Sequence, residues 1–431
     1  MLIYTIHDTP RFRYAAHCLL DPILSDVFIT NNEAQFQSHP GPKLAYGNCP
    51  VSNAIHIPII GSLVWQGAPQ KHDIKCGTWH STPTLYAGDG DVPCDVFAAT
   101  FFLLSRYEEY VPYQGDAMGR FTSSLSVTGD PSLLQRPLID EWRQLLMQKI
   151  LAKWPEIEIK KNSYRFYSSI DVDSAFAYVG KGFVRSCGGF AKDVWKRDWR
   201  NLKSRLSTLL QRNADKYDTY GYIQNTLQRF RCEHIYFFQL SDWAEYDRNV
   251  SHTSEVLRRK IKDVSSVYTV GVHPGVRSNF NKQILETEKS RLENIIGQEV
   301  HHSRQHYLML KFPATYQELI RVGIKEDFTM GYADAIGFRA GTSMPFYWYD
   351  LQQDCVTPLL VHPIAMMDTT LRKYMQLAPQ EAMQAGRTLI DHVKAVNGQC
   401  LVVWHNETLS ESDGWEGWRP VWEDQLAYGN Q

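Results

Sequence analysis

Two aspartates separated by a single residue, Asp171 and Asp173, directly follow the apolar run RFYSSI. On an extended chain, side chains at positions i and i+2 point to the same side. Two carboxylates held together repel each other, so either one keeps its proton or both face a cation. A divalent metal ion would bind one carboxylate and leave the other free to act as a base. The simpler alternative is a pair of loop aspartates that cap the next turn.

Two histidines also end apolar runs and are candidates for the same site. His273 closes VYTVGVH and is followed by a Pro-Gly pair, so the chain turns sharply there. Neutral imidazole together with carboxylate suits zinc and similar divalent ions. His405 closes CLVVWH and lies near Glu407, and it is a general-acid candidate because imidazole titrates near neutral pH. Either histidine, taken alone, could instead be an ordinary hydrogen-bonding residue.

Two arginines lie in segments that could present them to a substrate. Arg304 and His306 are two positions apart in HSRQHYLML, so they would lie side by side on an extended chain. Arg339 lies in GFRAGTSMPF, where glycines allow the backbone to approach a ligand closely, and we expect it in the catalytic site. Arginine is a fixed fork donor for a carboxylate or a substrate group. The alternative for the Arg339 segment is a plain turn.

The elements that must position these side chains alternate between strand and helix in the C-terminal part of the chain. Apolar runs predict strands, and helical spacing predicts helices between them. The predicted strands are 165–170, 234–240, 267–273, 306–312, 335–340, 358–363 and 400–405, and the predicted helices are 281–296, 314–321 and 379–396. This alternation predicts a parallel β/α barrel of about seven or eight units. Working residues of such barrels sit at the carboxyl ends of strands, so we expect Asp171, Asp173, His273 and His405 to converge on one rim.

The N-terminal part of the chain has a different residue pattern and is predicted to be a separate domain. Its first 90 or so residues are rich in Pro, Gly and Asn, and the apolar runs 54–60 and 62–65 predict short strands and turns. Residues 95–110 and 139–154 have helical spacing. A polar stretch follows, which places the domain boundary between 1–162 and 163–431.

Composition excludes several classes of protein. The chain has 431 residues, 43% of them hydrophobic, and a net charge of −2, which predicts a folded α/β protein and gives no sign of nucleic-acid binding. The eight cysteines include no C-x-x-C pair, so we expect free thiols rather than a zinc knuckle or a disulfide framework. The apolar start MLIYTIHD is too short for a signal peptide or a membrane span, and we expect a cytoplasmic protein.

The segments SSIDVDSAF, VGVHP, SRQHYL, GFRAGTSMPF and VVWHNETLSE, in this order, resemble the motifs of the polysaccharide-deacetylase superfamily (carbohydrate esterase, family four). More specifically, the chain resembles Bacteroidetes-type members that carry an extra N-terminal domain with a segment like DVFAATFFLLSRYEEY. The resemblance implies a distorted (β/α)7-type barrel with a smaller N-terminal α/β domain. It also implies a hydrolase that uses a divalent metal, with zinc expected, to remove acetyl groups from amino sugars of a polysaccharide or glycan precursor.

The resemblance also assigns roles to the motif residues. Asp171 matches the catalytic base, and Arg304 matches the arginine that orients this base. Asp173 and His273 match metal ligands. His405 matches the histidine that protonates the leaving amine.

The sequence departs from the family pattern at two positions. Arg277 stands where a second metal-binding histidine is typical, and an arginine cannot bind a cation. His306 stands where the family has a proline, and we hypothesise that it replaces the lost ligand, for a site of Asp173, His273 and His306. Without such a replacement the protein would be a catalytically inactive glycan-binding or scaffold protein. An amidohydrolase acting on a non-sugar amide is a third alternative, because a barrel and a metal do not name a substrate.

One further segment, residues 181–212, contains nine basic residues and only two acidic ones. Its apolar residues recur at helical spacing, which predicts a basic helical insertion near 181–230. They are Phe190, Val194, Trp195, Trp199, Leu202, Leu206 and Leu209. The interpretation we prefer is a helix packed on the barrel with a solvated basic face. The alternative is a basic amphipathic helix that contacts a membrane surface through 185–212.

Overall fold

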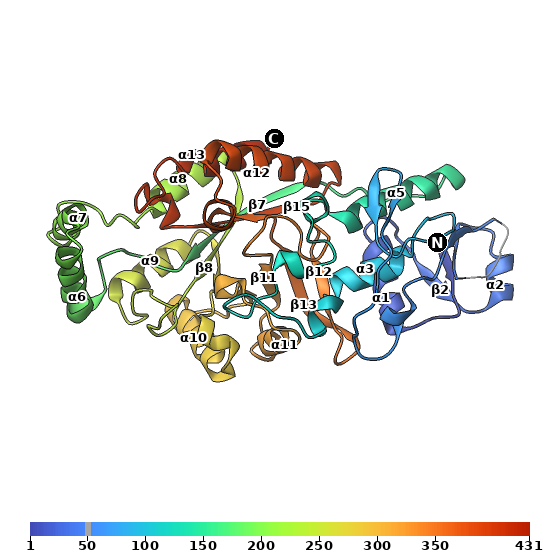
Figure 1. Ribbon diagram of the computed structural model, residues 1–431, viewed down its shortest axis with the longest axis horizontal. Helices are drawn as coiled ribbons and strands as arrows, with labels where there is room; N and C mark the ends of the chain where they lie inside the picture. The colour runs from blue at the N-terminus through green and yellow to red at the C-terminus, as the bar shows by residue number, and fades with distance from the viewer. Residues whose placement is uncertain (48–52) are drawn as a thin grey trace.

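The computed structural model describes residues 1–47 and 53–431, without the side chains of Leu63 and Val64. It contains a small parallel sheet and a larger, mostly parallel sheet at different positions along an elongated molecule (Figure 1). Seven cysteines in the described residues are free thiols, as the sequence predicted, and Cys49 lies outside the described residues. No helix of the described residues is long and apolar enough to cross a membrane.

The smaller sheet is built by the N-terminal part of the chain and has four parallel strands in the order β2-β1-β3-β4. Its strands are β1 (Leu2–Tyr4), β2 (Phe28–Thr30), β3 (Lys43–Tyr46) and β4 (Ile55–Ile57), with helices α1 (Pro10–Leu20) and α2 (Glu33–Ser38) between them. The predicted strand at 54–60 is confirmed as β4. The run 62–65 forms a 3-10 turn in which Trp65 donates to the Tyr46 hydroxyl at 2.8 Å.

The segment that follows joins the small sheet to the rest of the molecule. It contains the hairpin β5 (Gly77–Trp79) and β6 (Thr82–Thr84) and the helices α3 (Val96–Leu104), α4 (Pro131–Leu134) and α5 (Leu138–Lys153). Every residue of α3 is buried. The helix predicted over 95–110 ends early because Arg106 adopts a left-handed conformation (φ 53°), after which Tyr107–Tyr110 form a 3-10 turn.

The larger sheet has nine strands in the order β12-β13-β11-β10-β9-β8-β7-β15-β14, and among its pairings only that of β12 with β13 is antiparallel. Its strands are β7 (Arg165–Val172), β8 (Glu233–Phe238), β9 (Thr269–Val272), β10 (His302–Ser303), β11 (Glu326–Met330), β12 (Phe346–Asp350), β13 (Cys355–Pro363), β14 (Met366–Met367) and β15 (Gln399–His405). Because β13 pairs with β11 and the chain continues into β14, which pairs with β15, this segment bridges the two sides of the curled sheet.

Helices cover the outer side of this sheet, and apolar side chains fill its interior (Figure 1). The helices are α8 (Tyr220–Phe230), α9 (Glu255–Ser265), α10 (Lys282–Ile296), α11 (Ala314–Arg321), α12 (Pro379–Ala395) and α13 (Arg419–Gly429). Phe237, Phe328, Leu401 and Val403 belong to the interior cluster. Side chains alternate between the two sides of a strand, so β8 places Phe237 inside and its neighbours outside. The predicted α/β class, a distorted barrel with a smaller N-terminal α/β part, is confirmed.

Two predicted strands of this sheet are wrong. Residues 306–312 begin with a 3-10 turn in which Tyr307 and Leu308 have positive φ, and the strand is the short β10 just before them. Residues 335–340 form no strand because Gly337 (φ 127°) turns the backbone. Strands β11 and β12 were missed. In β11 the signal was masked by polar residues such as Asp327, which is buried and accepts from Ser303 and Thr329.

The basic insertion forms two helices, α6 (Gly182–Trp195) and α7 (Trp199–Leu209), that pack together as a hairpin. Figure 1 shows this hairpin projecting from the end of the molecule farthest from β2. The break between the helices falls at Arg197, which has a left-handed conformation (φ 54°). The insertion is thus two helices that project from the sheet, where the preferred interpretation placed an inserted helix packed on the barrel.

Candidate active site

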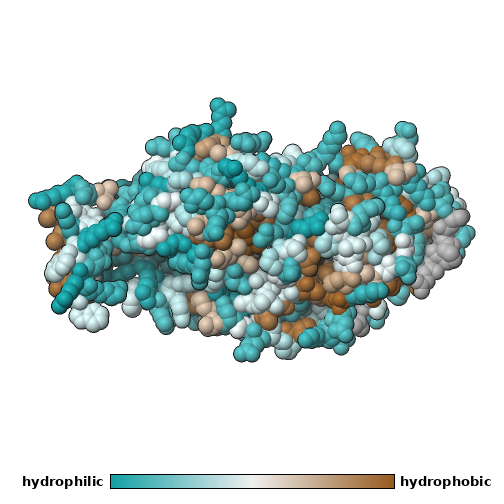
Figure 2. Space-filling model, turned by 45° about the horizontal axis from the view of Figure 1, so that its top comes forward, coloured by the Kyte–Doolittle hydropathy of each residue, from teal (hydrophilic) through white to brown (hydrophobic). Residues whose placement is uncertain are grey.

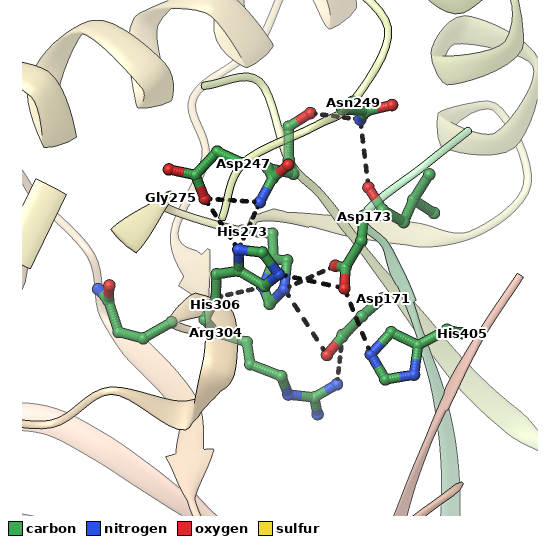
Figure 3. Close-up of polar contacts among 12 residues, drawn as sticks. Asp171, Asp173, Asp247, Asn249, His273, Gly275, Arg304, His306 and His405 are labelled. Atoms are coloured by element: carbon green, nitrogen blue, oxygen red, sulfur yellow. Dashed lines mark hydrogen bonds and ion pairs between the residues drawn. The ribbon is translucent and has the colours of Figure 1, made fainter. Parts of the chain in front are cut away.

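The carboxyl ends of four strands of the larger sheet bring the candidate residues together. Asp171 lies at the end of β7 and Asp173 just beyond it, while His273 follows β9 and His405 ends β15. Arg304 and His306 follow β10, a strand of only two residues. Because these strands are parallel, their ends share one rim, and Figure 3 shows the side chains pointing toward one another.

Asp173 stands between two imidazoles. Its Oδ1 lies 3.0 Å from His273 Nε2, and its Oδ2 lies 3.2 Å from His306 Nε2. One oxygen or nitrogen from each of the three residues can be chosen so that all lie within 4.8 Å of one another. One carboxylate and two imidazoles at such spacing are a donor set that suits zinc and related divalent ions.

Hydrogen bonds on the far side of each ring decide which nitrogen faces Asp173. His273 Nδ1 lies 2.5 Å from the carbonyl oxygen of Arg304, and His306 Nδ1 lies 2.9 Å from Asp247 Oδ1. Since a carbonyl can only accept, His273 Nδ1 carries the proton and donates, and its Nε2 presents a lone pair toward Asp173. His306 Nδ1 lies between the Asp247 carboxylate and the side-chain amide nitrogen of Gln239, which is 2.6 Å away. An imidazole with an outer carboxylate or carbonyl partner is the arrangement found among metal-binding histidines.

Two atoms of this group are buried without a hydrogen-bond partner, namely His273 Nε2 and Asp173 Oδ1. They face each other at 3.0 Å, and both are acceptors in this tautomer. Two desolvated acceptors at that distance repel each other and are stabilised when a cation lies beside both. The residues present therefore fit a divalent metal ion.

The pKa values of the group reflect the same electrostatic field. Burial alone would raise the pKa of Asp173, but the neighbouring imidazoles of His306 and His405 hold it well below its usual range. Burial lowers the pKa of His306, but the carboxylates of Asp173 and Asp247 outweigh burial and raise it to about 9. The local potential is thus negative and attracts a cation, whether a proton or a metal.

Asp171 lies beside this group and has a different partner. Its Oδ1 accepts from Arg304 Nη1 at 2.7 Å, and its Oδ2 lies 3.9 Å from His273 Nε2. Both Asp171 and Arg304 are buried. The guanidinium fixes the orientation of the carboxylate, and the second oxygen is directed toward the metal-ligand candidates.

His405 lies on the other side of Asp173, and a carboxylate orients it too. Its Nδ1 donates to Asp368 Oδ1 at 2.8 Å, and its Nε2 lies 3.6 Å from Asp173 Oδ2. Burial lowers the pKa of His405, but Asp368 and Asp173 together raise it to about 10. Nearby Glu407 has a buried Oε2 without a partner, and burial together with the charge of Asp173 raises its pKa to about 7.

A cavity of about 200 Å³ opens over these residues. Its wall includes the aromatic side chains of Tyr307, Tyr374 and Trp415 and the cation of Lys373. The N-terminal part of the chain also contributes to this wall through Arg120, whose guanidinium donates to the Tyr307 carbonyl and to the Tyr374 hydroxyl, both at 3.0 Å. The small cavity is therefore bounded by both parts of the molecule.

Two arginines singled out in the sequence lie outside the cavity. Arg339 is buried, but it pairs with Glu109 and donates to the carbonyl of Gly331 at 3.1 Å. Arg277 is exposed on the 3-10 turn Val276–Asn279, so it does not fill the space of the missing histidine. The structure thus does not bring Arg339 to the site.

Two residues that orient the site were missed by the sequence reasoning. Asp368 follows β14, so the rule that functional residues follow strands would have found it, but a two-residue strand leaves no visible apolar run. Asp247 lies in an irregular loop after β8 and had no local signal. Both are buried acids whose roles depend on contacts between distant segments.

Comparisons with known proteins match different parts of the chain. Residues 1–155 match a family model described as a family of unknown function, DUF7033. No curated protein sequence matches the chain.

Solved structures match about three fifths of the chain. An assigned polysaccharide deacetylase from Mycobacterium smegmatis is 12% identical with a TM-score of 0.41, and the match covers 62% of this chain and 84% of that one. A polysaccharide deacetylase from Bacillus cereus is 11% identical with a TM-score of 0.30, covering 61% and 87%. A pseudoenzyme of carbohydrate esterase family four from Bacillus anthracis is 11% identical with a TM-score of 0.27, covering 62% and 63%. These structures bear the name of the superfamily that the sequence motifs resemble, and the likeness is distant.

Proposed function

We propose that this protein is a metal-dependent hydrolase that removes acetyl groups from amino sugars of a polysaccharide or glycan precursor. One observation carries the proposal. The donor set of Asp173, His273 and His306 lies between two further groups, namely the Asp171 carboxylate, which Arg304 holds, and the His405 imidazole, which Asp368 holds. Such an arrangement supplies a metal site, a base and an acid around one cavity.

The three ligand candidates would hold a divalent ion, with zinc expected, and the ion would polarise the acetyl carbonyl and lower the pKa of a bound water. Asp171 accepts the proton of the attacking water, and Arg304 keeps its carboxylate in place. His405 donates a proton from Nε2 to the departing nitrogen, while Asp368 holds the opposite nitrogen. The aromatic wall of the cavity offers flat apolar faces on which the C–H face of a sugar ring can pack.

The position of His306 supports an active enzyme over an inactive glycan-binding protein. The loss of a histidine at Arg277 would leave only two metal ligands if nothing replaced it. His306 points its Nε2 at Asp173 from a neighbouring strand end, and Asp247 orients the ring as it would for a ligand. A third ligand is therefore within reach without moving the backbone.

The metal site is tested by the metal content of the purified protein after exposure to zinc and dialysis. We expect stoichiometric zinc in the natural protein and a large loss of zinc in His306→Ala. The matched control is His301→Ala, which removes a half-buried histidine that pairs with Glu299 outside the cavity and should leave the zinc content unchanged. Unchanged zinc in His306→Ala would rule out its role as the third ligand.

The reaction is tested by measuring acetate released from oligomers of N-acetylglucosamine by the zinc-loaded protein. We expect Asp171→Asn to lower the rate by about a thousandfold or more while keeping the zinc, because the amide cannot accept a proton. Asp424→Asn, which changes an acid paired with exposed Arg387, is the control and should leave the rate unchanged. Zinc-loaded natural protein that released no acetate from any N-acetylated sugar would contradict the substrate class.

A further inference from the structure

The hairpin of α6 and α7 exposes large apolar side chains to an unusual degree. Phe183, Val184 and Trp195 are more than four fifths exposed (85%, 82% and 82%), and Trp199 is 62% exposed. Val194, Leu206, Leu209 and Leu210 are exposed as well. Figure 2 shows apolar atoms among strongly hydrophilic ones at the left end of the molecule, where the hairpin lies. Large apolar side chains exposed in such number on one short element indicate an interaction surface.

These side chains form stripes along the outer sides of the two helices. In α6, Val184, Cys187, Val194 and Trp195 fall within an arc of about 100° around the helix and share one side. In α7, Trp199, Leu206 and Leu209 do the same. Both stripes are exposed, so the hairpin presents its apolar sides outward instead of burying them against the sheet.

Polar contacts hold the inner side of the hairpin together. Asp193 of α6 accepts from Arg205 at 2.7 Å and from Asn201 at 2.8 Å, both on α7. The Arg205 guanidinium also lies over the ring of Phe190 at 5.6 Å. Asp193 and Arg205 are buried, so their ion pair holds α6 and α7 together. A hairpin with ionic contacts on its inner side and apolar stripes on its outer sides is suited to binding another apolar surface.

The charge of the hairpin identifies the kind of surface. Residues 181–212 contain nine basic and two acidic residues in a chain whose net charge is −2. Exposed cations flank the apolar stripes, namely Lys192, Lys196, Arg197, Arg200 and Lys203. Tryptophan beside lysine and arginine suits the boundary between lipid headgroups and acyl chains, where the ring enters the apolar layer and the cations meet anionic headgroups. A second copy of the hairpin would instead bring two cationic surfaces together.

We propose that the α6–α7 hairpin docks this protein onto an anionic lipid membrane. The helices have 14 and 11 residues, too few to span a bilayer, so they lie in the plane of the membrane surface. The hairpin is inserted in the segment that leaves the carboxyl end of β7, the same rim that carries Asp173. Near the turn between the two helices, Arg200 lies 4.0 Å from Glu416 in the loop that holds Trp415 of the cavity wall.

Sedimentation with lipid vesicles tests the proposal on the full-length protein. We expect it to sediment with vesicles of equal parts phosphatidylglycerol and phosphatidylcholine but not with vesicles of phosphatidylcholine alone. Salt of about 0.5 M should weaken binding, because it screens the attraction of exposed cations to headgroups. The double variant Trp195→Ala and Trp199→Ala should lower the partition coefficient by about tenfold or more, because it removes the two aromatic rings that the bilayer would bury.

The matched control is Phe28→Ala, which removes an exposed aromatic ring (61%) on β2, far from the hairpin (Figure 1). It should bind vesicles as the natural protein does, and circular dichroism and zinc content should be unchanged in every variant. Failure to bind anionic vesicles at low salt overturns the proposal, and so does equal binding by the double variant. Self-association that the two tryptophan substitutions abolish, without vesicle binding, would instead make the hairpin an interface between copies of the chain.

Discussion

Two ionic clusters of this protein each place one carboxylate between two basic side chains. They differ in whether their buried polar atoms have hydrogen-bond partners. In the arginine cluster, Glu109 Oε1 accepts from Arg106 at 2.8 Å and from Arg339 at 2.9 Å, and Oε2 accepts from Arg339. In the imidazole cluster, Asp173 Oδ1 and His273 Nε2 have no hydrogen-bond partner although they are buried. The first cluster is complete by itself, and the second requires another group.

This difference separates structural from functional polar residues more reliably than the local sequence does. The glycines around Arg339 indicated a close approach to a ligand, but the approach is to the chain itself. Gly341 comes so near Leu103 of α3 that a β-carbon there would lie 2.6 Å from its side chain. Arg106 also donates to the carbonyl of Arg339. The arginine cluster therefore fastens the N-terminal part of the chain to the larger sheet.

The largest expected effect is on stability and comes from breaking the arginine cluster. Arg339→Ala should lower the free energy of unfolding by about 3–5 kcal/mol, because Glu109 is left buried without its main partner. The control is Arg387→Ala. It removes an exposed arginine that binds both carboxylate oxygens of Asp424, as Arg339 binds those of Glu109, and it should leave the melting temperature nearly unchanged. Thermal unfolding measures both. Equal melting temperatures for the two variants, or loss of zinc from folded Arg339→Ala, would break the distinction between the clusters.

An intermediate effect is expected where an outer carboxylate orients His306, the third metal ligand that we propose. Asp247→Asn should weaken zinc affinity by about 10- to 100-fold, because the amide holds His306 less firmly and no longer raises its basicity. Asp368→Asn is the matched control, since Asp368 orients His405, which we place outside the ligand set. Competition with a zinc chelator gives both affinities. A loss of affinity in Asp368→Asn as large as in Asp247→Asn would place His405 among the ligands.

The smallest effect concerns Glu288, a buried acid that is only partly satisfied. It accepts from the Gly275 amide at 2.8 Å, and burial raises its pKa to about 7 from an ordinary 4.5. Between these values the native state holds a proton that the unfolded state has lost, so stability falls as pH rises from about 4.5 to 7. Glu288→Gln cannot ionise and should lack this fall, worth about 2–3 kcal/mol between pH 5 and pH 8. Melting temperatures at pH 5 and pH 8 measure it, and an identical pH dependence in both proteins would contradict the raised pKa.

Much of the candidate site could be predicted from the sequence because its residues follow apolar strands. Asp171, His273 and His405 end runs that are buried on both sides, and the carboxyl ends of parallel strands meet at one rim. The helices 281–296, 314–321 and 379–396 were predicted to within a residue or so, because their apolar spacing and first residues are strong local signals. These features depend on neighbours in the chain.

The sequence by itself determined the α/β class, the alternation of strands and helices and the residue types available at the rim, since local periodicity carries that information. Only the tertiary structure decided that Arg339 pairs with Glu109, that Asp247 and Asp368 orient two imidazoles, and that the basic insertion stands away from the sheet as a hairpin. The physical reason is that the partner of a buried charge and the surface that covers an apolar stripe are set by contacts between segments far apart in the chain. Those contacts leave no pattern in the residues around either partner.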